Sequence, residues 1–258
     1  MARIIAVTNQ KGGVGKTTTS VNLSACIAAE GKRVLLIDID PQGNATSGLG
    51  QSGKGEYSVY DVLIGDAAVR DAIIKTGVAE LDLLPATISL AGAEIELVDI
   101  PKREQLLKSA LGAVGADYDY IMMDCPPSLG LLTLNALTAA DSILIPIQCE
   151  YYALEGVGQL MNTLNLVRKR LNPGLEVEGV VLTMLDGRTN LGLQVVQEVK
   201  KYFRDRVFTT IVPRNVRLSE APSHGLPIHL YDPKCQGTMA YTELAKELIG
   251  ETSLNDDW

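Results

Sequence analysis

Residues 10–18 read QKGGVGKTT, and the rest of the chain is organised around this stretch. The apolar run 4–7 precedes it and residues 19–25 continue it, an order that predicts a strand, a glycine-rich turn and a helix. The glycines allow the turn to face its N–H groups inward, and the helix directs the positive end of its dipole into the same space. We therefore expect a polyphosphate site, with Lys16 on the outer phosphates and Thr17 at a Mg²⁺ ion.

The same stretch carries a second lysine, Lys11, and has Gln10 where the GxxxxGK[ST] pattern has its first glycine. Lys11 and Lys16 would repel each other on one phosphate group. Lys11 is therefore predicted to point outward, toward an anion supplied by a second copy of the chain. A lysine that is simply solvated on a loop is the alternative.

The composition predicts one cytoplasmic domain. The chain has 258 residues, of which 46% are apolar, enough for a large core over residues 1–250 followed by a polar, acidic tail at 251–258. It contains no apolar run long enough to span a membrane and no signal-peptide pattern at residues 1–8. Its four cysteines are scattered without a CxxC pair, so neither a disulfide nor a cysteine metal site is expected.

Charge is unevenly distributed along the sequence. The net charge is −8, which by itself argues against a nucleic-acid partner. Residues 168–217, however, contain ten Lys or Arg against five Asp or Glu. A basic face on an acidic body is compatible with binding a polyanion.

Apolar runs predict the strands. They are nearly continuous rather than alternating, which indicates burial on both faces, and helical stretches separate most of them. The fold class is therefore α/β, a mostly parallel twisted sheet with helices on both faces. A helix is expected from about Lys16 to Ala29, ending at Gly31, and another over 101–113 with Pro101 at its first position. The runs are 3–8, 33–38, 81–84, 119–124, 142–147, 178–184 and 207–212.

Acidic residues follow two of these runs. Asp38 and Asp40 end the second, and alternation along a strand would put both on one side, where one can hold Mg²⁺ through water and the other can orient an attacking water. Asp124 ends the apolar strand 120–124, as in a Walker B element, and would hold the water shell of the metal. The alternative for each is a carboxylate that caps a turn.

The stretches 11–18, 38–44 (DIDPQGN) and 124–128 (DCPPS) together resemble the deviant Walker A ATPases, and more closely the ParA and Soj partitioning ATPases. Residues 148–156, 183–186 and 213–223 also match the chromosomal Soj branch. The resemblance covers residues 2 to about 250, so the expected fold is that of a P-loop ATPase.

The resemblance implies an ATP-bound sandwich homodimer that binds double-stranded DNA without sequence preference, associates with the nucleoid and is stimulated by a ParB-type centromere-binding protein. It implies that Lys11 reaches the phosphates of the other subunit, that Asp40 positions the water, that Pro213 and Asn215 lie near the adenine, and that Glu150 and Tyr152 lie near the nucleotide or the dimer seam. Hydrolysis would be weak without partner and DNA. The implied nucleotide-binding set is Gly12, Gly13, Val14, Gly15, Lys16, Thr17, Thr18, Glu150, Pro213 and Asn215, and the metal set is Thr17, Asp38 and Asp124.

Other classes with the same fold are less compatible with the sequence. A MinD-like division-site regulator would need a basic amphipathic C-terminal helix, whereas residues 251–258 are acidic. A nitrogenase-type iron protein would need paired cluster cysteines, and Cys125 lies inside the DCPPS stretch instead. A metabolic ligase would need a second substrate pocket, for which we identify no residues.

Arg188 and Arg217 are the predicted DNA contacts. Both lie in short polar segments after predicted strands, and both match positions that the resemblance implicates in DNA binding. Pairing of Arg188 with Asp186 and of Arg217 with Glu220 is the alternative.

Overall fold

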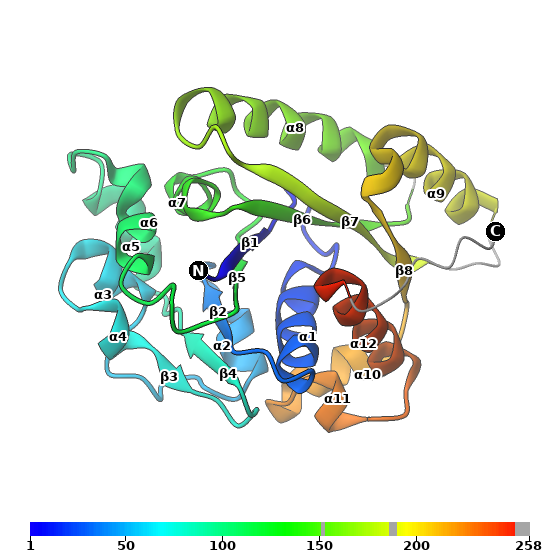
Figure 1. Cartoon of the computed structure of the whole chain (residues 1–258), viewed down its shortest axis with the longest axis horizontal. Coiled ribbons are helices and arrows are strands. Elements are labelled where there is room, and N and C mark those ends of the chain that lie inside the picture. Colours follow the sequence, from blue (N-terminus) through cyan, green and yellow to red (C-terminus); the bar gives the residue numbers. More distant parts are fainter. Residues whose placement is uncertain (151–152, 186–189, 251–258) are drawn as a thin grey trace.

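The computed structural model describes residues 1–150, 153–185 and 190–250, which build one eight-stranded sheet (Figure 1). The strand order is β3-β4-β2-β5-β1-β6-β7-β8, and every neighbouring pair is parallel except β3 with β4. The strands are β1 Arg3–Val7, β2 Val34–Asp38, β3 Ile74–Lys75, β4 Leu81–Leu84, β5 Tyr120–Asp124, β6 Ser142–Gln148, β7 Glu176–Leu185 and β8 Val207–Pro213.

The predicted fold class is confirmed. All seven predicted strands are present within two residues of their expected ends, and β2 is buried along its whole length, as its unbroken apolar run indicates. Only β3 was not predicted, because two residues are too short to form a recognisable pattern.

Helices cover both faces of the sheet. They are α1 Lys16–Ala29, α2 Asn44–Gly48, α3 Val59–Ile64, α4 Val69–Ala72, α5 Leu90–Glu96, α6 Leu106–Leu111, α7 Leu131–Ala139, α8 Ala153–Arg170, α9 Asn190–Phe203, α10 Val216–Glu220, α11 Ile228–Tyr231 and α12 Gln236–Ile249, with short 3₁₀ helices η1 Arg103–Gln105, η2 Arg204–Arg206 and η3 Ala221–His224. Among the described residues, none of the helices is both long and apolar enough to cross a bilayer. The predicted division into one domain over residues 1–250 and a tail at 251–258 stays a prediction.

Two apolar cores lie on opposite faces of the sheet. Successive residues of a strand point to opposite faces and so belong to different cores. Ile5 and Val7 pack in the core with α1 and α12, whereas Ala6, between them, packs in the core that includes residues of α7 and α8. Figure 1 shows α1 and α12 on one side of the sheet and α7 and α8 on the other. This double cover fixes the sheet rigidly behind the loops at its edge.

The first helix agrees with its prediction. α1 begins at Lys16, directly after Gly15, and ends at Ala29, with Gly31 in the left-handed conformation at φ 77°. Most of α1 is buried, and the Thr19 hydroxyl lies 3.2 Å from the Tyr241 hydroxyl of α12.

The start predicted for the helix after residue 100 is wrong. Pro101 is not its first residue: the chain turns at Lys102 (φ 56°), passes through η1 and enters α6 at Leu106. The buried Asn135 of α7 sets this start, because its Oδ1 accepts from Leu107 N (3.1 Å) and its Nδ2 donates to Arg103 O (2.8 Å). A tertiary cap therefore overrides the local proline signal.

Candidate functional site

The carboxyl ends of β1, β2 and β5 bring the three predicted motifs together. β5 lies between β1 and β2, with Asp124 in register with Val7 on one side and with Asp38 on the other. Loops from the ends of parallel strands meet at one edge, where open α/β sheets bind ligands.

The glycine-rich loop is anchored from both sides. Asn9 Nδ2 donates to Pro146 O (2.8 Å), and Thr183 Oγ1 donates to Val14 O (2.9 Å). Gly13 and Gly15 have φ of 74° and 89°, which side chains with a Cβ rarely adopt. The loop is therefore held open as a backbone cradle at the start of α1.

Lys16 extends back across its own loop. Its Nζ donates to Lys11 O (3.1 Å), and the side chain is buried. Burial lowers the pKa of Lys16, while the nearby Asp124 carboxylate opposes that shift. A phosphate group in the loop would supply a further anionic partner.

Asp124 is fully buried and only partly satisfied. Its Oδ1 accepts from Ser20 Oγ (2.9 Å), and the Thr17 side chain lies next to the same carboxylate. Oδ2 has no partner among the described residues. Burial, and next the charge of Asp38, raises the pKa of Asp124 to about 7. Thr17 and Asp124, which the sequence predicted to be neighbours, are therefore adjacent, and Asp124 Oδ2 has no donor among the described residues.

Asp38 is engaged in holding the next loop. Its Oδ2 accepts from both N and Oγ1 of Thr46, each at 2.8 Å, and its Oδ1 accepts from Asp40 N (3.2 Å). Burial raises its pKa to about 6. The expectation that Asp38 and Asp40 share one strand face is wrong, because β2 ends at Asp38 and Asp40 lies in the following bend.

Lys11 and Glu150 pair within one chain. Lys11 Nζ lies 3.5 Å from Glu150 Oε2, and both side chains are partly exposed. Lys11 is thus neither buried in the phosphate loop nor left without a partner. Its action on a second copy stays a prediction, and Tyr152 lies outside the described residues.

Two adjoining cavities open above this edge. The first, of about 490 Å³, is lined by the glycine-rich loop with Lys16, Thr17, Thr18, Asp40, Gln42, Asn44, Pro127 and Met184. The second, of about 380 Å³, shares Gly15, Thr18 and Met184 with it and adds Thr183, Val212, Pro213, Arg214, Asn215, Val216, Leu218, Ser219, Pro222 and Tyr241. Together they have the form of a polar pocket joined to a more apolar one.

Pro213 and Asn215 line the second cavity. Their position next to the adenine stays a prediction. Asn215 also begins α10, since its Oδ1 accepts from Arg217 N (2.8 Å). Gln42, Asn44 and Met184 line the cavities; they lie in the stretches 38–44 and 183–186, but the sequence assigned no role to them. Met184 has φ of 54°, unusual for a residue with a side chain and frequent at functional sites.

The predicted DNA contacts have different outcomes. Arg217 pairs with Glu220 (2.8 Å) and also with Asp232 (3.4 Å), so the alternative pairing is present in the single chain. Arg188 lies outside the described residues.

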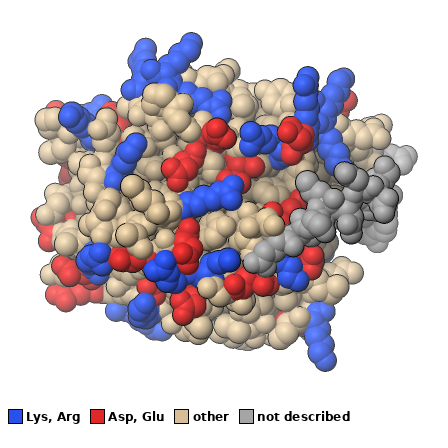
Figure 2. Space-filling model, in the orientation of Figure 1, with Lys and Arg blue, Asp and Glu red and all other residues tan. Residues whose placement is uncertain are grey.

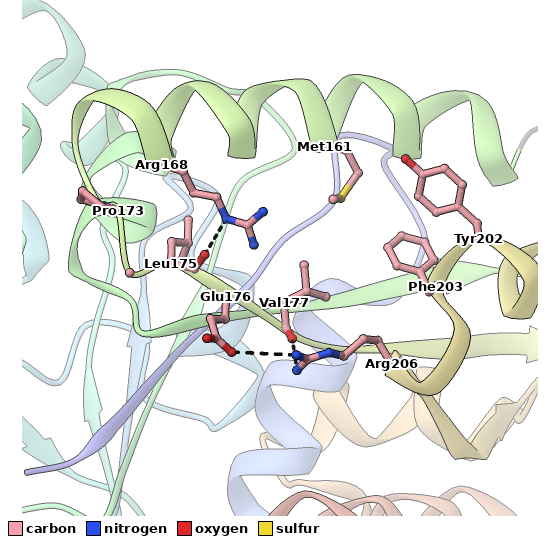
Figure 3. Close-up of a pocket in the computed structure, with 10 residues that line it drawn as sticks. Met161, Arg168, Pro173, Leu175, Glu176, Val177, Tyr202, Phe203 and Arg206 are labelled. Atoms are coloured by element: carbon pink, nitrogen blue, oxygen red, sulfur yellow. Dashed lines mark hydrogen bonds and ion pairs between the residues drawn. The ribbon is translucent and has the colours of Figure 1, made fainter.

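A further cavity, of about 540 Å³, lies at the other end of β7 (Figure 3). Arg168 and Arg206 line it: Arg168 Nε donates to Leu175 O (2.6 Å), and Arg206 Nη1 donates to Val177 O (3.0 Å). It shares no residue with the two cavities described above, so it does not belong to the same site.

The basic segment 168–217 is therefore not one surface. The basic residues at the end of α8 precede β7, and those at the end of α9 and in η2 precede β8, so both groups lie at amino-terminal ends of strands. Arg214 and Arg217 instead follow the carboxyl end of β8. Lys and Arg side chains project from the upper edge in Figure 2, over α8 and α9, and charges of both signs are mixed elsewhere on this face.

A cradle of backbone N–H groups, a buried lysine and a buried carboxylate at the carboxyl edge of a parallel sheet define a P-loop nucleotide-binding protein. Comparison with known proteins then specifies the family. The AAA_31 model, described as an AAA domain, matches residues 2–177. The sporulation initiation inhibitor protein Soj of Bacillus subtilis (strain 168) is 68% identical over 249 residues, 96% of this chain and 98% of that protein.

The chromosome partitioning protein ParA of Myxococcus xanthus (strain DK1622) is 55% identical over 96% of this chain and 88% of its own length. A solved structure of cobyrinic acid a,c-diamide synthase from Mycobacterium smegmatis, with bound ADP and magnesium, has a TM-score of 0.84 and 41% identity over 96% of this chain and 94% of that one. The chain belongs to the Soj/ParA family of chromosome-partitioning ATPases.

Proposed function

We propose that this protein binds ATP with Mg²⁺, forms a homodimer around it, binds double-stranded DNA without sequence preference as that dimer, and partitions chromosomes or plasmids with a ParB-type partner. Hydrolysis is slow until partner and DNA stimulate it. The 68% identity to Soj and the ADP and magnesium of the Mycobacterium smegmatis structure support this function.

One observation carries the nucleotide assignment: among residues 1–150, 153–185 and 190–250, Asp124 Oδ2 is buried without a donor, beside Thr17 and close to Lys16. A buried carboxylate oxygen without a partner is costly unless a ligand satisfies it. Within the described residues no three His, Cys, Asp or Glu side chains are grouped to hold a metal. In proteins Mg²⁺ is usually held through one or two carboxylates together with substrate phosphates. The ion would neutralise phosphate charge when bound.

The side chains divide the work around this oxygen. Lys16 and the loop N–H groups bind the phosphates, Thr17 and Asp124 hold the metal and its water shell, and Asp40, on the cavity wall, orients the attacking water. Asp38 keeps the loop that carries Asp40 in place through Thr46. Pro213 and Asn215 accommodate the base in the second cavity.

Isothermal titration with ATP and Mg²⁺ tests the nucleotide site. Lys16→Ala should weaken ATP binding at least about 100-fold, because a cationic partner of the phosphates is removed. Lys102→Ala, an exposed lysine outside both cavities, is the matched control and should bind as the wild type does. Unchanged ATP affinity in Lys16→Ala would refute the assignment.

A further inference from the structure

The cavity at the amino-terminal end of β7, drawn in Figure 3, has walls that the fold itself holds in place. On one side, the turn between α8 and β7 is fixed by the buried Asn172, whose Nδ2 donates to Leu137 O (3.0 Å). On the other side, Gly179 allows η2 and β8 to approach β7 closely. A Cβ at Gly179 would collide with the Phe208 ring and would lie 3.1 Å from Arg206 O. The cavity is therefore preformed, as small-molecule sites usually are.

An uncovered edge of β7 runs along this cavity. β8 pairs with β7 only from Val180 onward, so no strand of the described chain covers the first residues of β7 on that side. Glu176 N donates in the opposite direction, to Asp141 O just before β6 (3.0 Å). Since successive residues of a strand alternate in direction, the carbonyl groups of Leu175 and Val177 face the uncovered edge.

Two guanidinium groups are anchored on these carbonyls. Arg168 Nε donates to Leu175 O (2.6 Å), and Arg206 Nη1 donates to Val177 O (3.0 Å). The two carbonyl groups are about 7 Å apart, because two residues separate them along the strand. A guanidinium has five N–H donors, so most donors of both arginines are left for another acceptor. An anion placed between two cations held this close is stabilised by both.

The carboxylates near the cavity offset these arginines only in part. Glu176 is the one acidic residue among the ten that line it, and its carboxylate lies 3.9 Å from Arg206 with the side chain 70% exposed. Arg168 has no ion pair within the part of the chain that the structure describes. Glu178 of β7 and Asp205 of η2 do not line the cavity, and Glu178 has an ion pair of its own. The lining therefore keeps a net positive charge.

The remainder of the lining is largely apolar and partly aromatic. The rings of Tyr202 and Phe203 pack edge to face, with centroids 4.8 Å apart. Figure 3 shows these rings across the cavity from Arg168, with Met161 and Val177 between them. The volume of about 540 Å³ is in the range of small-molecule sites. A ligand with a charged group at one end and a flat apolar body at the other can contact both sides at once.

We propose that this cavity binds a small organic anion with an aromatic body, whose carboxylate or phosphate group lies between Arg168 and Arg206 and whose ring packs against Tyr202. Carboxylates and phosphates both present the oxygens that guanidinium groups bind in pairs. The cavity shares no residue with the two nucleotide cavities, so this inference does not depend on the proposed function.

Titration of the full chain with 1-naphthylacetate and with 1-naphthyl phosphate, followed by saturation-transfer NMR, tests the site. The tighter of the two probes identifies the preferred charged group. The first control is 1-naphthylacetamide, which keeps the ring without the charge, and the second is acetate, which keeps the charge without the ring. The tighter naphthyl anion should bind at least about ten-fold more strongly than either control, because only it contacts both sides of the cavity.

Three variants locate the binding. Arg168→Gln/Arg206→Gln should lower the affinity for the anion to that for the amide. Lys169→Gln/Lys201→Gln removes the same charge from exposed positions at the ends of α8 and α9, outside the cavity, and should retain the wild-type affinity. Tyr202→Ser leaves both arginine hydrogen bonds intact and should weaken binding at least about three-fold, so the site can be tested even if the arginine variant does not fold.

Equal affinities for the anion and the amide, equal losses in the two double variants, or an unchanged affinity in Tyr202→Ser would each overturn the proposal. Lys16→Ala separates this cavity from the phosphate loop, and binding that persists in this variant supports the second site. Binding lost in Lys16→Ala but kept in Arg168→Gln/Arg206→Gln would place the probe at the phosphate loop and would overturn the proposal as well.

Discussion

Asp124 illustrates how a single buried carboxylate links stability to ligand binding. Its Oδ2 has no donor among the described residues, and burial raises its pKa to about 7 from an ordinary value of 3.8. Between those two pH values the folded protein keeps a proton that the unfolded chain has released. Stability in the absence of nucleotide therefore falls as the pH rises from about 4 to 7, and the decrease is complete above that range.

Asp124→Asn should stabilise the nucleotide-free protein by about 2 kcal/mol at pH 8, because a carboxylate charge that is only partly satisfied in the buried site is removed. The gain should shrink toward pH 5, where the wild-type carboxyl is protonated. Urea unfolding at both pH values measures this. Asp119→Asn is the control: hydrogen bonds from Arg33 hold the pKa of Asp119 near 2, so this variant should show no gain at either pH. A wild type as stable as Asp124→Asn at pH 8 would contradict the prediction.

Lys11 and Asp40 should be separable by their effects on assembly. If Lys11 leaves Glu150 to reach the phosphates of a second subunit, Lys11→Ala should bind ATP but neither dimerise nor hydrolyse it. Asp40→Ala should dimerise and persist as an ATP dimer, because only the water lacks its orienting group. Light scattering with ATP distinguishes the two. A monomeric Asp40→Ala protein, or an ATP-dependent dimer of Lys11→Ala, argues against the mechanism.

At the scale of elements, the sequence predicts what local pattern controls. The runs of buried aliphatic residues located the strands, and Gly15 and Gly31 marked the ends of α1. The sequence pattern also assigned the glycine-rich loop, Thr17 and Asp124 to one site, and the fold brings these residues together. Contacts between residues distant in sequence were not predictable in this way. Three features depend on neighbours that only the fold supplies: the hydrogen bonds from Thr46 to Asp38, the cap that Asn135 provides for α6, and the positive φ of Met184.

Asn135 provides an element-scale test. Asn135→Ala leaves Leu107 N and Arg103 O without their partner inside the protein, so the free energy of unfolding should fall by about 2 to 3 kcal/mol. ATP affinity should not change, because Asn135 lines neither nucleotide cavity. Urea unfolding and titration measure the two quantities. Asn165→Ala, on the exposed side of α8, should leave stability unchanged; a similar decrease there would remove the case for the cap.

At the scale of the whole molecule, the sheet places basic residues that are close in sequence at two opposite edges. β7 has ten residues, so its two ends lie about 30 Å apart. Arg217 follows β8 at the nucleotide edge, whereas Lys169 and Arg170 end α8 at the opposite edge. Under the proposed function, a DNA surface controlled by ATP is expected at the nucleotide edge, where dimer formation would double the number of phosphates that the protein neutralises.

Arg188→Ala/Arg217→Ala should therefore weaken DNA binding to all duplexes alike and leave ATP-dependent dimerisation intact. Each phosphate that the variant no longer neutralises should lower the slope of log affinity against log salt by about 0.9. In the free chain Arg217 is paired with Glu220 and Asp232, so phosphate must displace these carboxylates, and Glu220→Gln should strengthen binding modestly. Lys169→Ala/Arg170→Ala removes the same charge from the opposite edge and should retain the wild-type slope. Filter binding with ATP over a salt series measures all four proteins. Two results would show that the DNA surface lies elsewhere: an equal loss of DNA affinity and salt slope in the two double variants, or binding of plasmid DNA by the dimeric Arg188→Ala/Arg217→Ala variant as by the wild type.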